Sequence, residues 1–273
     1  MIVSDNPKFI CFQPWKCGSS TLYRRLKKFD NGRYPQTAYF NDVLGKNSHK
    51  HIALDDFFKL PESSQNHKRF AFVRNPYDRM YSGYLQRRLR MKNLLLHSHF
   101  DEISEENREE NRHLEKGFAA FILFVRDRFK RNGEAFGKPL YRHIYYRKKP
   151  AIDLAGFVET FDKSFDQICK SIGIPETNSE NVNVKYNQGD IETAENFQAA
   201  RFRYIDKYSR HSIEAVNEIY ELDFQCLGYR MLKPIDLDGD WHEINSTLSP
   251  FSDAVMPEQF GQIKKFDRHN DLE

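Results

Sequence analysis

The sequence has few cysteines, no long apolar run and little net charge, and each absence excludes a class of protein. Its 273 residues include four cysteines without a C-x-x-C pair, which are Cys11, Cys17, Cys169 and Cys226. This usage is typical of a reduced, cytosolic chain. No apolar run approaches the length of a membrane span, and no signal sequence precedes the first predicted strand, so we expect a cytoplasmic protein. With 42 basic and 39 acidic residues the net charge is only +3, which does not indicate general binding to nucleic acid.

The sequence also lacks clustered metal ligands, repeats and low-complexity segments. Neither carboxylates nor His and Cys residues cluster with a ligand spacing, so no metal is expected. Hydrophobic residues make up 39% of the chain and charged residues 30%, which allows one sizeable core without requiring a second one. The composition is that of an ordinary soluble enzyme.

The stretch of residues 8–22 reads as a buried strand, a tight polar turn and the first turn of a helix. Residues 9–12 form a continuous apolar run of the kind found in strands covered on both faces. The turn that follows combines Lys16, Gly18 and three hydroxyl side chains. Because a helix N-terminus attracts anions and glycine lets a phosphate approach the backbone, the stretch predicts a phosphate-binding turn. Taken alone, the turn is equally consistent with a Ser/Thr-rich helix cap.

The order of residues in this turn separates two phosphate-binding motifs. A Walker A loop places its lysine after the glycines, whereas here Lys16 comes first. The run K-C-G-S-S-T instead resembles the 5′-phosphosulfate loop, K-x-G-[ST]-[ST], of sulfotransferases that use 3′-phosphoadenosine 5′-phosphosulfate (PAPS). The proline that usually precedes the family's lysine is displaced, because Trp15 holds that place and Pro14 lies one residue earlier. The resemblance implies that the cofactor's 5′ end is bound by Lys16, Cys17, Gly18, Ser19, Ser20 and Thr21.

A second predicted strand-to-helix turn carries an independent pattern. Residues 69–73 form another apolar run, and Asn75 and Pro76 suit the N-cap and the first position of a helix. Arg74 would then stand at the C-terminal edge of a strand, where open α/β sheets bind ligands. The pattern R-N-P-x-D-x-x-x-S resembles the 3′-phosphate site of the same sulfotransferases, which implies that Arg74 and Ser82 hold the 3′-phosphate. A surface ion pair is the alternative role for Arg74.

A histidine between the two turns is the candidate general base. His51 directly precedes a short apolar run, residues 52–54, that is expected to form a sheet strand. In the carbohydrate and bacterial group that includes heparan sulfate 2-O-sulfotransferase, a histidine stands at the point where this chain reads HKHIALDDF. The resemblance implies that His51 removes the proton of the acceptor hydroxyl, a role that a neutral imidazole suits near pH 7. His49, His143 and a glutamate are the alternatives.

The rest of the chain predicts elements that surround these turns. The acidic run at residues 101–110 reads as a solvated helix or a mobile insertion, which could be part of a lid over the acceptor. Residues 140–147, rich in rings and cations, are a candidate wall of the acceptor pocket. Lys185 lies in a loop that approaches the adenine in relatives and is a weak candidate cofactor contact. A further strand is predicted at residues 152–158, and helices at residues 20–28, 76–93, 117–129, 165–172 and 213–222.

These predictions combine into one α/β domain. We expect a central, mainly parallel sheet flanked by helices, with a P-loop-like phosphosulfate-binding turn. The domain spans residues 1–232, and residues 233–273 form a C-terminal extension of unassigned role. The expected reaction is transfer of a sulfuryl group from PAPS to a hydroxyl of a carbohydrate, lipid or small-molecule acceptor, without a metal. A P-loop nucleotide kinase and a non-catalytic nucleotide-binding protein remain the alternatives.

Overall fold

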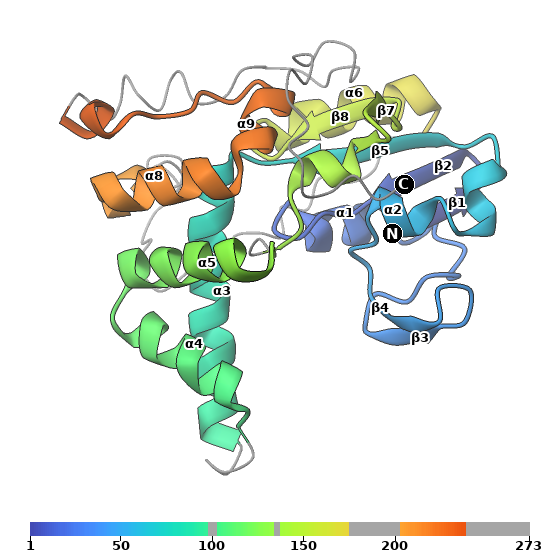
Figure 1. Cartoon of the computed structure of the whole chain (residues 1–273). Helices are drawn as coiled ribbons and strands as arrows, with labels where there is room; N and C mark the ends of the chain where they lie inside the picture. Colours follow the sequence, from blue (N-terminus) through green and yellow to red (C-terminus); the bar gives the residue numbers. More distant parts are fainter. Residues whose placement is uncertain (98–102, 134–136, 175–202, 239–273) are drawn as a thin grey trace, which may run out of the picture.

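The computed structural model describes residues 1–97, 103–133, 137–174 and 203–238, and its centre is a four-stranded sheet (Figure 1). The sheet order is β1-β2-β5-β8, in which β2, β5 and β8 run parallel and β1 is antiparallel to β2. The prediction of an α/β fold with a mainly parallel sheet is therefore confirmed, although β1 was not predicted. The four strands are β1 (Ile2–Asp5), β2 (Lys8–Phe12), β5 (Lys68–Val73) and β8 (Leu154–Phe157).

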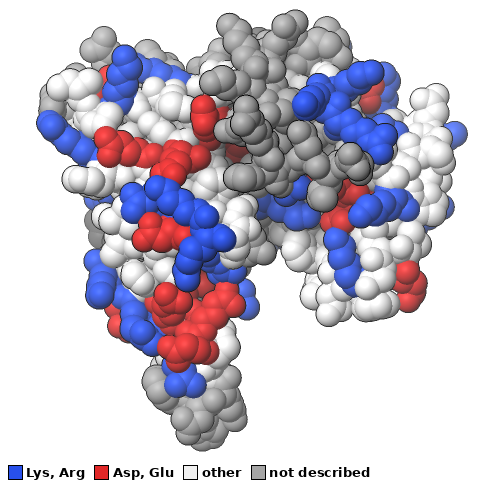
Figure 2. Space-filling model, in the orientation of Figure 1, with Lys and Arg blue, Asp and Glu red and all other residues white. Residues whose placement is uncertain are grey.

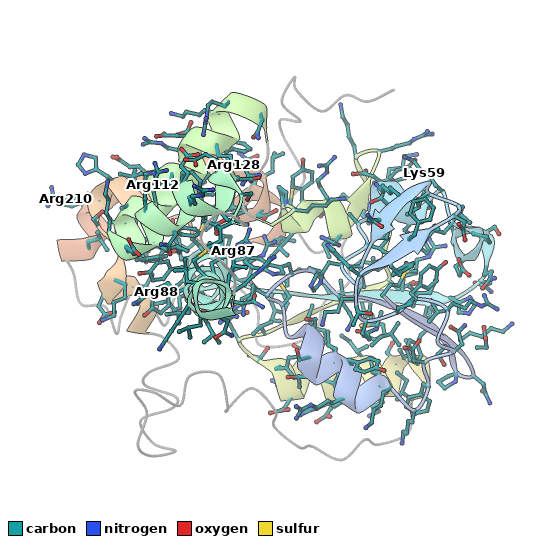
Figure 3. The ribbon with its side chains drawn as sticks, turned by 90° about the horizontal axis from the view of Figure 1, so that it is seen from below. Lys59, Arg87, Arg88, Arg112, Arg128 and Arg210 are labelled. Atoms are coloured by element: carbon teal, nitrogen blue, oxygen red, sulfur yellow. The ribbon has the colours of Figure 1, made fainter. Side chains whose placement is uncertain are left out.

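Helices cover both faces of this sheet, because side chains alternate along each strand. On one face α6 packs through Phe161, whose ring stacks on Phe72 of β5 at 4.6 Å between centroids. On the other face the ring of Phe57 in α2 meets the edge of Phe12 of β2 at 5.0 Å. Figure 3 shows α1 and α6 together on one side of the sheet. The bounds of these helices are α1 (Ser19–Leu26), α2 (Leu54–Phe57) and α6 (Phe161–Ile172).

A group of helices forms the second part of the described structure, beside the sheet (Figure 1). Helix α3 starts at the end of β5 and leads out of the sheet into this group, where α4, α5 and α8 pack around it. The helices are α3 (Pro76–His97), α4 (Glu105–Glu115), α5 (Phe118–Asn132), α8 (Arg210–Ile219) and α9 (Glu221–Leu227). Short elements complete the description, namely β3 (Tyr39–Asn41), β4 (Lys46–Ser48), β6 (Tyr145–Tyr146), β7 (Lys149–Pro150), η1 (Pro61–Ser64), η3 (Leu140–His143), η5 (Arg203–Lys207) and η6 (Pro234–Asp238).

The acidic run forms a helix, α4, which ion pairs join to its neighbours. Glu110 is buried and pairs with Arg87 of α3 at 3.0 Å, and Glu106 pairs with Arg128 of α5 at 2.6 Å. Figure 2 shows basic and acidic side chains interleaved over this part, and Figure 3 places Arg87 and Arg128 there, away from Lys59. Of the two structures expected for residues 101–110, the helix is observed from Glu105 onward.

Two local predictions are wrong. Residues 51–53 form no strand, and the chain enters α2 at Leu54, because Asp55 and Asp56 favour the first turn of a helix. The single helix expected over residues 213–222 is two helices, α8 and α9, which meet at Tyr220. Lys185 and its loop lie outside the described residues. Among the described helices, none combines the length and the apolar character that crossing a membrane requires.

Candidate functional site

The turn between β2 and α1 leaves the start of a helix open. Gly18 is the N-cap of α1 and offers no capping side chain, and its φ of 76° lies in the left-handed region. A Cβ at this position would come within 2.8 Å of the Phe161 ring, so both backbone and packing require glycine. The first N–H groups of a helix have no acceptor within the helix. Those of Ser19, Ser20 and Thr21 therefore form a donor group that suits an anion.

Two kinds of side chain surround this turn: the hydroxyl side chains of residues 19–21, and the thiol side chain of Cys17. Thr21 is buried, and its Oγ1 has no hydrogen-bond partner among the described residues. Ser19 is partly buried and Ser20 is exposed. Cys17 instead faces the core: its side chain is fully buried, burial raises the pKa of its thiol to about 12, and its N–H donates to the Pro14 carbonyl at 3.2 Å. Cys17 thus shapes the turn from inside.

Lys16 has an unusual backbone and an unusual charge environment. Its φ of 63° is left-handed, a conformation that non-glycine residues seldom adopt. Burial, followed by repulsion from Arg74, lowers the pKa of its ammonium group from 10.5 to about 8. A nearby anion would be stabilised by this charge and would in turn raise the pKa of Lys16.

Arg74 lies at the end of β5 and reaches back to the turn after β2. Its Nε and Nη2 donate to the two carboxylate oxygens of Asp78 at 2.6 and 2.8 Å, and its Nη1 donates to the Lys16 carbonyl at 3.1 Å. Burial opposes the charge of Arg74, but Asp78 outweighs it and raises the pKa further above its usual range. The guanidinium has five N–H donors, and three of them bind partners within the described part of the chain, which leaves two for a ligand.

The start of α3 holds Arg74 in this place. Asn75 caps the helix by accepting the Tyr77 N–H at 2.9 Å, and its own N–H donates to Glu159 at 2.6 Å. Glu159 follows β8 and also accepts the Tyr229 hydroxyl at 3.1 Å. Ser82 lies one helical turn beyond Asp78 and is partly buried. The N-cap role predicted for Asn75 is confirmed.

His51 is fixed against the same turn by a hydrogen bond to the backbone. Its Nδ1 lies 2.5 Å from the carbonyl oxygen of Gln13, and burial lowers the pKa of the imidazole to about 3. A carbonyl oxygen only accepts, so Nδ1 carries the proton of the neutral ring and Nε2 carries the lone pair. His51 is therefore neutral at pH 7, in the tautomer that leaves Nε2 able to accept a proton. The backbone N–H of His51 donates to His49 Nδ1 at 2.9 Å, so the two histidines are in direct contact.

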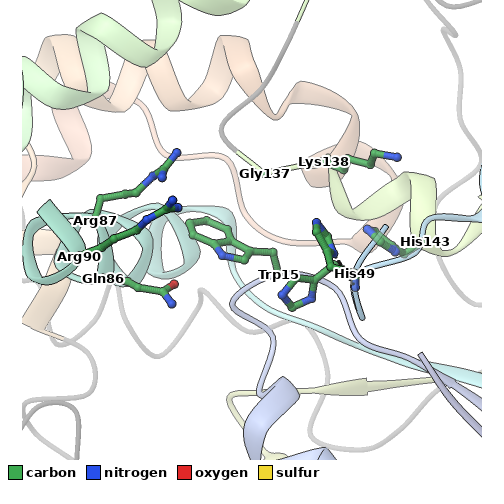
Figure 4. A pocket seen from close by; sticks show the side chains of 9 residues that line it. Trp15, His49, Gln86, Arg87, Arg90, Gly137, Lys138 and His143 are labelled. Atoms are coloured by element: carbon green, nitrogen blue, oxygen red, sulfur yellow. Dashed lines mark hydrogen bonds between the residues drawn. The ribbon is translucent and has the colours of Figure 1, made fainter. Parts of the chain in front are cut away.

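A cavity of about 300 Å³ opens beside the histidines (Figure 4). Figure 4 shows Trp15 between Arg87 and Arg90, which come from α3, and His49. His143 is buried, and its Nδ1 has no partner among the described residues. Residues 140–147 were the predicted acceptor wall, and η3 supplies His143 to the lining. Among the described residues, the lining consists of Trp15, His49, His51, Gln86, Arg87, Arg90, Gly137, Lys138 and His143, and none of these is acidic.

Arg79 connects the two sides of the site and was not predicted. It is 1% exposed and donates to the carbonyls of Trp15 at 3.0 Å and Lys138 at 2.6 Å. Asp223, also buried, lies 3.7 Å from Arg79 and accepts the N–H groups of Leu140 and Tyr141. Burial raises the pKa of Asp223 to about 6. The role of Arg79 could have been predicted only from the burial of a charged side chain in α3. Burial cannot be read reliably from one sequence, so the sequence offers no usable signal.

The structure thus brings three segments that are distant in the sequence to the turn after β2. The carbonyl of Gln13 binds His51, that of Trp15 binds Arg79, and that of Lys16 binds Arg74.

A sequence model described as the sulfotransferase family covers residues 1–230. No curated protein and no solved structure matches the chain.

Proposed function

The chain belongs to the sulfotransferase family, and we propose that it transfers a sulfuryl group from PAPS to a hydroxyl of a carbohydrate or small-molecule acceptor. Three carbonyls within four residues support this proposal. That of Gln13 binds the candidate base His51, and that of Lys16 binds Arg74 of the candidate 3′-phosphate site. That of Trp15 binds Arg79, which also binds the carbonyl of Lys138 in the cavity lining. The proposal depends mainly on the fact that these three side chains bind the same short turn. A sulfuryl transfer needs donor, acceptor and base within a few ångströms of one another.

The cofactor is held at its two phosphate ends. The 5′-phosphosulfate lies at the N-terminus of α1, where the N–H groups of residues 18–21 and the hydroxyls of Ser19, Ser20 and Thr21 bind its oxygens. The unpartnered, buried Oγ1 of Thr21 supports this placement. Cys17 contributes through the shape of the turn. Arg74, with two free donors, and Ser82 hold the 3′-phosphate.

The transfer breaks the bond between the sulfur and the bridging oxygen of the 5′-phosphate, and forms one between the sulfur and the acceptor oxygen. Negative charge grows on the bridging oxygen as the 3′-phosphoadenosine 5′-phosphate (PAP) leaves. Lys16 neutralises that charge, so it acts mainly in the transition state. The acceptor proton passes to Nε2 of His51, whose Nδ1–H binds the Gln13 carbonyl. Burial lowers the pKa of the free imidazole, and the negative charge of the bound phosphosulfate raises it again, so that the ring accepts the proton.

The cavity beside His51 takes the acceptor. Trp15 offers a flat apolar face for a sugar ring or another ring, and the basic lining suits an acceptor with an anionic group. Arg87 is already paired with Glu110, whereas Arg90 is exposed on the cavity rim. Arg90 is therefore the side chain that we assign to such a group.

A turnover assay tests this function. The purified protein is incubated with PAPS and a panel of matched neutral and anionic glycosides and alcohols, and PAP release and product mass are measured. We expect PAP to form only with an acceptor whose mass increases by one sulfuryl group. Tight binding of ATP or ADP in place of PAP would instead identify a nucleotide kinase.

A further inference from the structure

Asp78 accepts a hydrogen bond from Arg74 on each of its two carboxylate oxygens. The two bonds, 2.6 Å from Nε and 2.8 Å from Nη2, use the same side of the guanidinium. Both side chains are largely buried, at 18% and 9% exposure, and they lie one helical turn apart at the start of α3. A buried bidentate pair of this kind fixes the plane of the guanidinium, which a single hydrogen bond does not.

The bonds that Arg74 makes leave a defined part of it for a ligand. Asp78 takes the Nε–H and one N–H of Nη2, and the Lys16 carbonyl takes one N–H of Nη1. One donor on Nη1 and one on Nη2 remain. A phosphate that accepts both would be bound in the two-point geometry that arginine favours.

Another carboxylate competes for Arg74. Glu159 is near enough to attract the guanidinium electrostatically, and it is held in place by the N–H of Asn75 and the hydroxyl of Tyr229. Without Asp78, Arg74 would be free to turn toward Glu159. Its two remaining donors would then change their direction relative to the site.

We propose that Asp78 is a positioning residue that aims Arg74 at the 3′-phosphate, and that it thereby sets the preference of the site for a 3′,5′-bisphosphate over a 5′-monophosphate. This inference rests on the proposed function. Asp78 touches neither phosphate itself. Its negative charge beside a phosphate site is compensated by Arg74 and by the positive end of α3.

The test compares two nucleotides that differ only in the 3′-phosphate. Dissociation constants of PAP and of adenosine 5′-monophosphate (AMP) are measured by calorimetry for the wild type, Arg74→Ala and Asp78→Asn. We expect the wild type to prefer PAP by about tenfold or more, the range of a charge-assisted bidentate contact. Asp78→Asn should lose most of this preference, as Arg74→Ala does, while AMP affinity changes by less than about twofold. If Asp78 had a purely structural role, Asp78→Asn would weaken the binding of PAP and of AMP by similar factors.

The Arg25–Asp162 pair supplies a matched control. It also joins an arginine to a carboxylate in the first turn of a helix, α6, but it serves no predicted phosphate site. Asp162→Asn should leave the PAP preference unchanged. If Asp78→Asn does not fold, Asp78→Glu, which keeps the carboxylate but displaces it, should give an intermediate preference.

The measured dissociation constants distinguish a failure of this inference from a failure of the proposed function. A wild type that does not bind PAP overturns the proposed function. A wild type whose PAP preference depends on Arg74 but survives Asp78→Asn overturns only the role of Asp78.

Discussion

Two turns at the same edge of the sheet are built in opposite ways. The β2 turn, residues 13–21, leaves polar groups open: its helix has no capping side chain, and the Thr21 hydroxyl has no partner in the part of the chain that the structure describes. In the β5 turn, residues 74–79, most polar groups are paired inside the protein. Asp78 binds Arg74, and Glu159 binds the N–H of Asn75.

The difference indicates that the β2 turn contributes mainly to the chemical step and the β5 turn mainly to cofactor binding. Open groups at the β2 turn suit the end of the cofactor where charge changes during reaction, because donors that are already in place can stabilise charge as it develops on the ligand. The paired groups of the β5 turn suit an end that only anchors, because they fix one arginine in one direction. Substitutions in the β2 turn and its partner His51 should therefore affect turnover most, and those in the β5 turn should affect binding.

The largest effect is expected for His51→Ala. Loss of a positioned general base should lower turnover by about a hundredfold to ten-thousandfold while PAP affinity stays nearly unchanged. Steady-state kinetics and calorimetry measure the two quantities. His49→Ala and His143→Ala are the matched controls, and a larger loss in either one would assign the base there.

The second-largest effect is expected for Lys16→Ala. Removal of the charge that neutralises the departing 5′-phosphate should cut turnover by about a hundredfold to a thousandfold and weaken PAP by a much smaller factor. The same two assays apply. Equal losses in turnover and binding would make Lys16 a phosphate clamp and remove the contrast between the turns.

Arg74→Ala should act on binding. The loss of a charge-assisted contact should weaken PAP by roughly 1.5 to 3 kcal/mol and leave AMP nearly unaffected. Circular dichroism checks the fold, because the substitution also leaves Asp78 without its partner. Unchanged affinity for PAP in a folded variant would show that Arg74 does not bind the 3′-phosphate.

The smallest effect is a change in the shape of the pH profile. Burial and Arg74 lower the pKa of Lys16 to about 8, so the free enzyme loses this charge as the pH rises through that value. The ratio kcat/KM for PAPS should therefore be higher below about pH 8 and fall above it. Lys16→Arg keeps its charge at high pH and should lack the alkaline decline. Persistence of the decline in Lys16→Arg would assign it to another group.

The two turns could be predicted from sequence because each is a local pattern. An apolar run followed by glycine and hydroxyls, or by Arg-Asn-Pro, specifies both a backbone course and a chemistry within about ten residues. The long connection between β2 and β5 permits their parallel pairing, which the structure shows. The short strand β1 was missed because its pairing with β2 gives no motif of its own.

Contacts between distant residues could not be predicted. The hydrogen bond of His51 to Gln13 spans 38 residues, and that of Arg79 to Trp15 spans 64. The strand expected after His51 was wrong because its apolar residues serve the core from an irregular segment and from α2. Periodicity indicates that such residues are buried, but it does not indicate against which segment.

Calorimetric titration of the wild type with PAP and with ADP shows whether the two turns form one site for a 3′,5′-bisphosphate. The two nucleotides carry the second phosphate at different positions, so they separate a site made of two turns from a general nucleotide site. We predict one PAP site per chain and much weaker binding of ADP, with or without magnesium. Binding of ADP as tight as that of PAP would contradict the account.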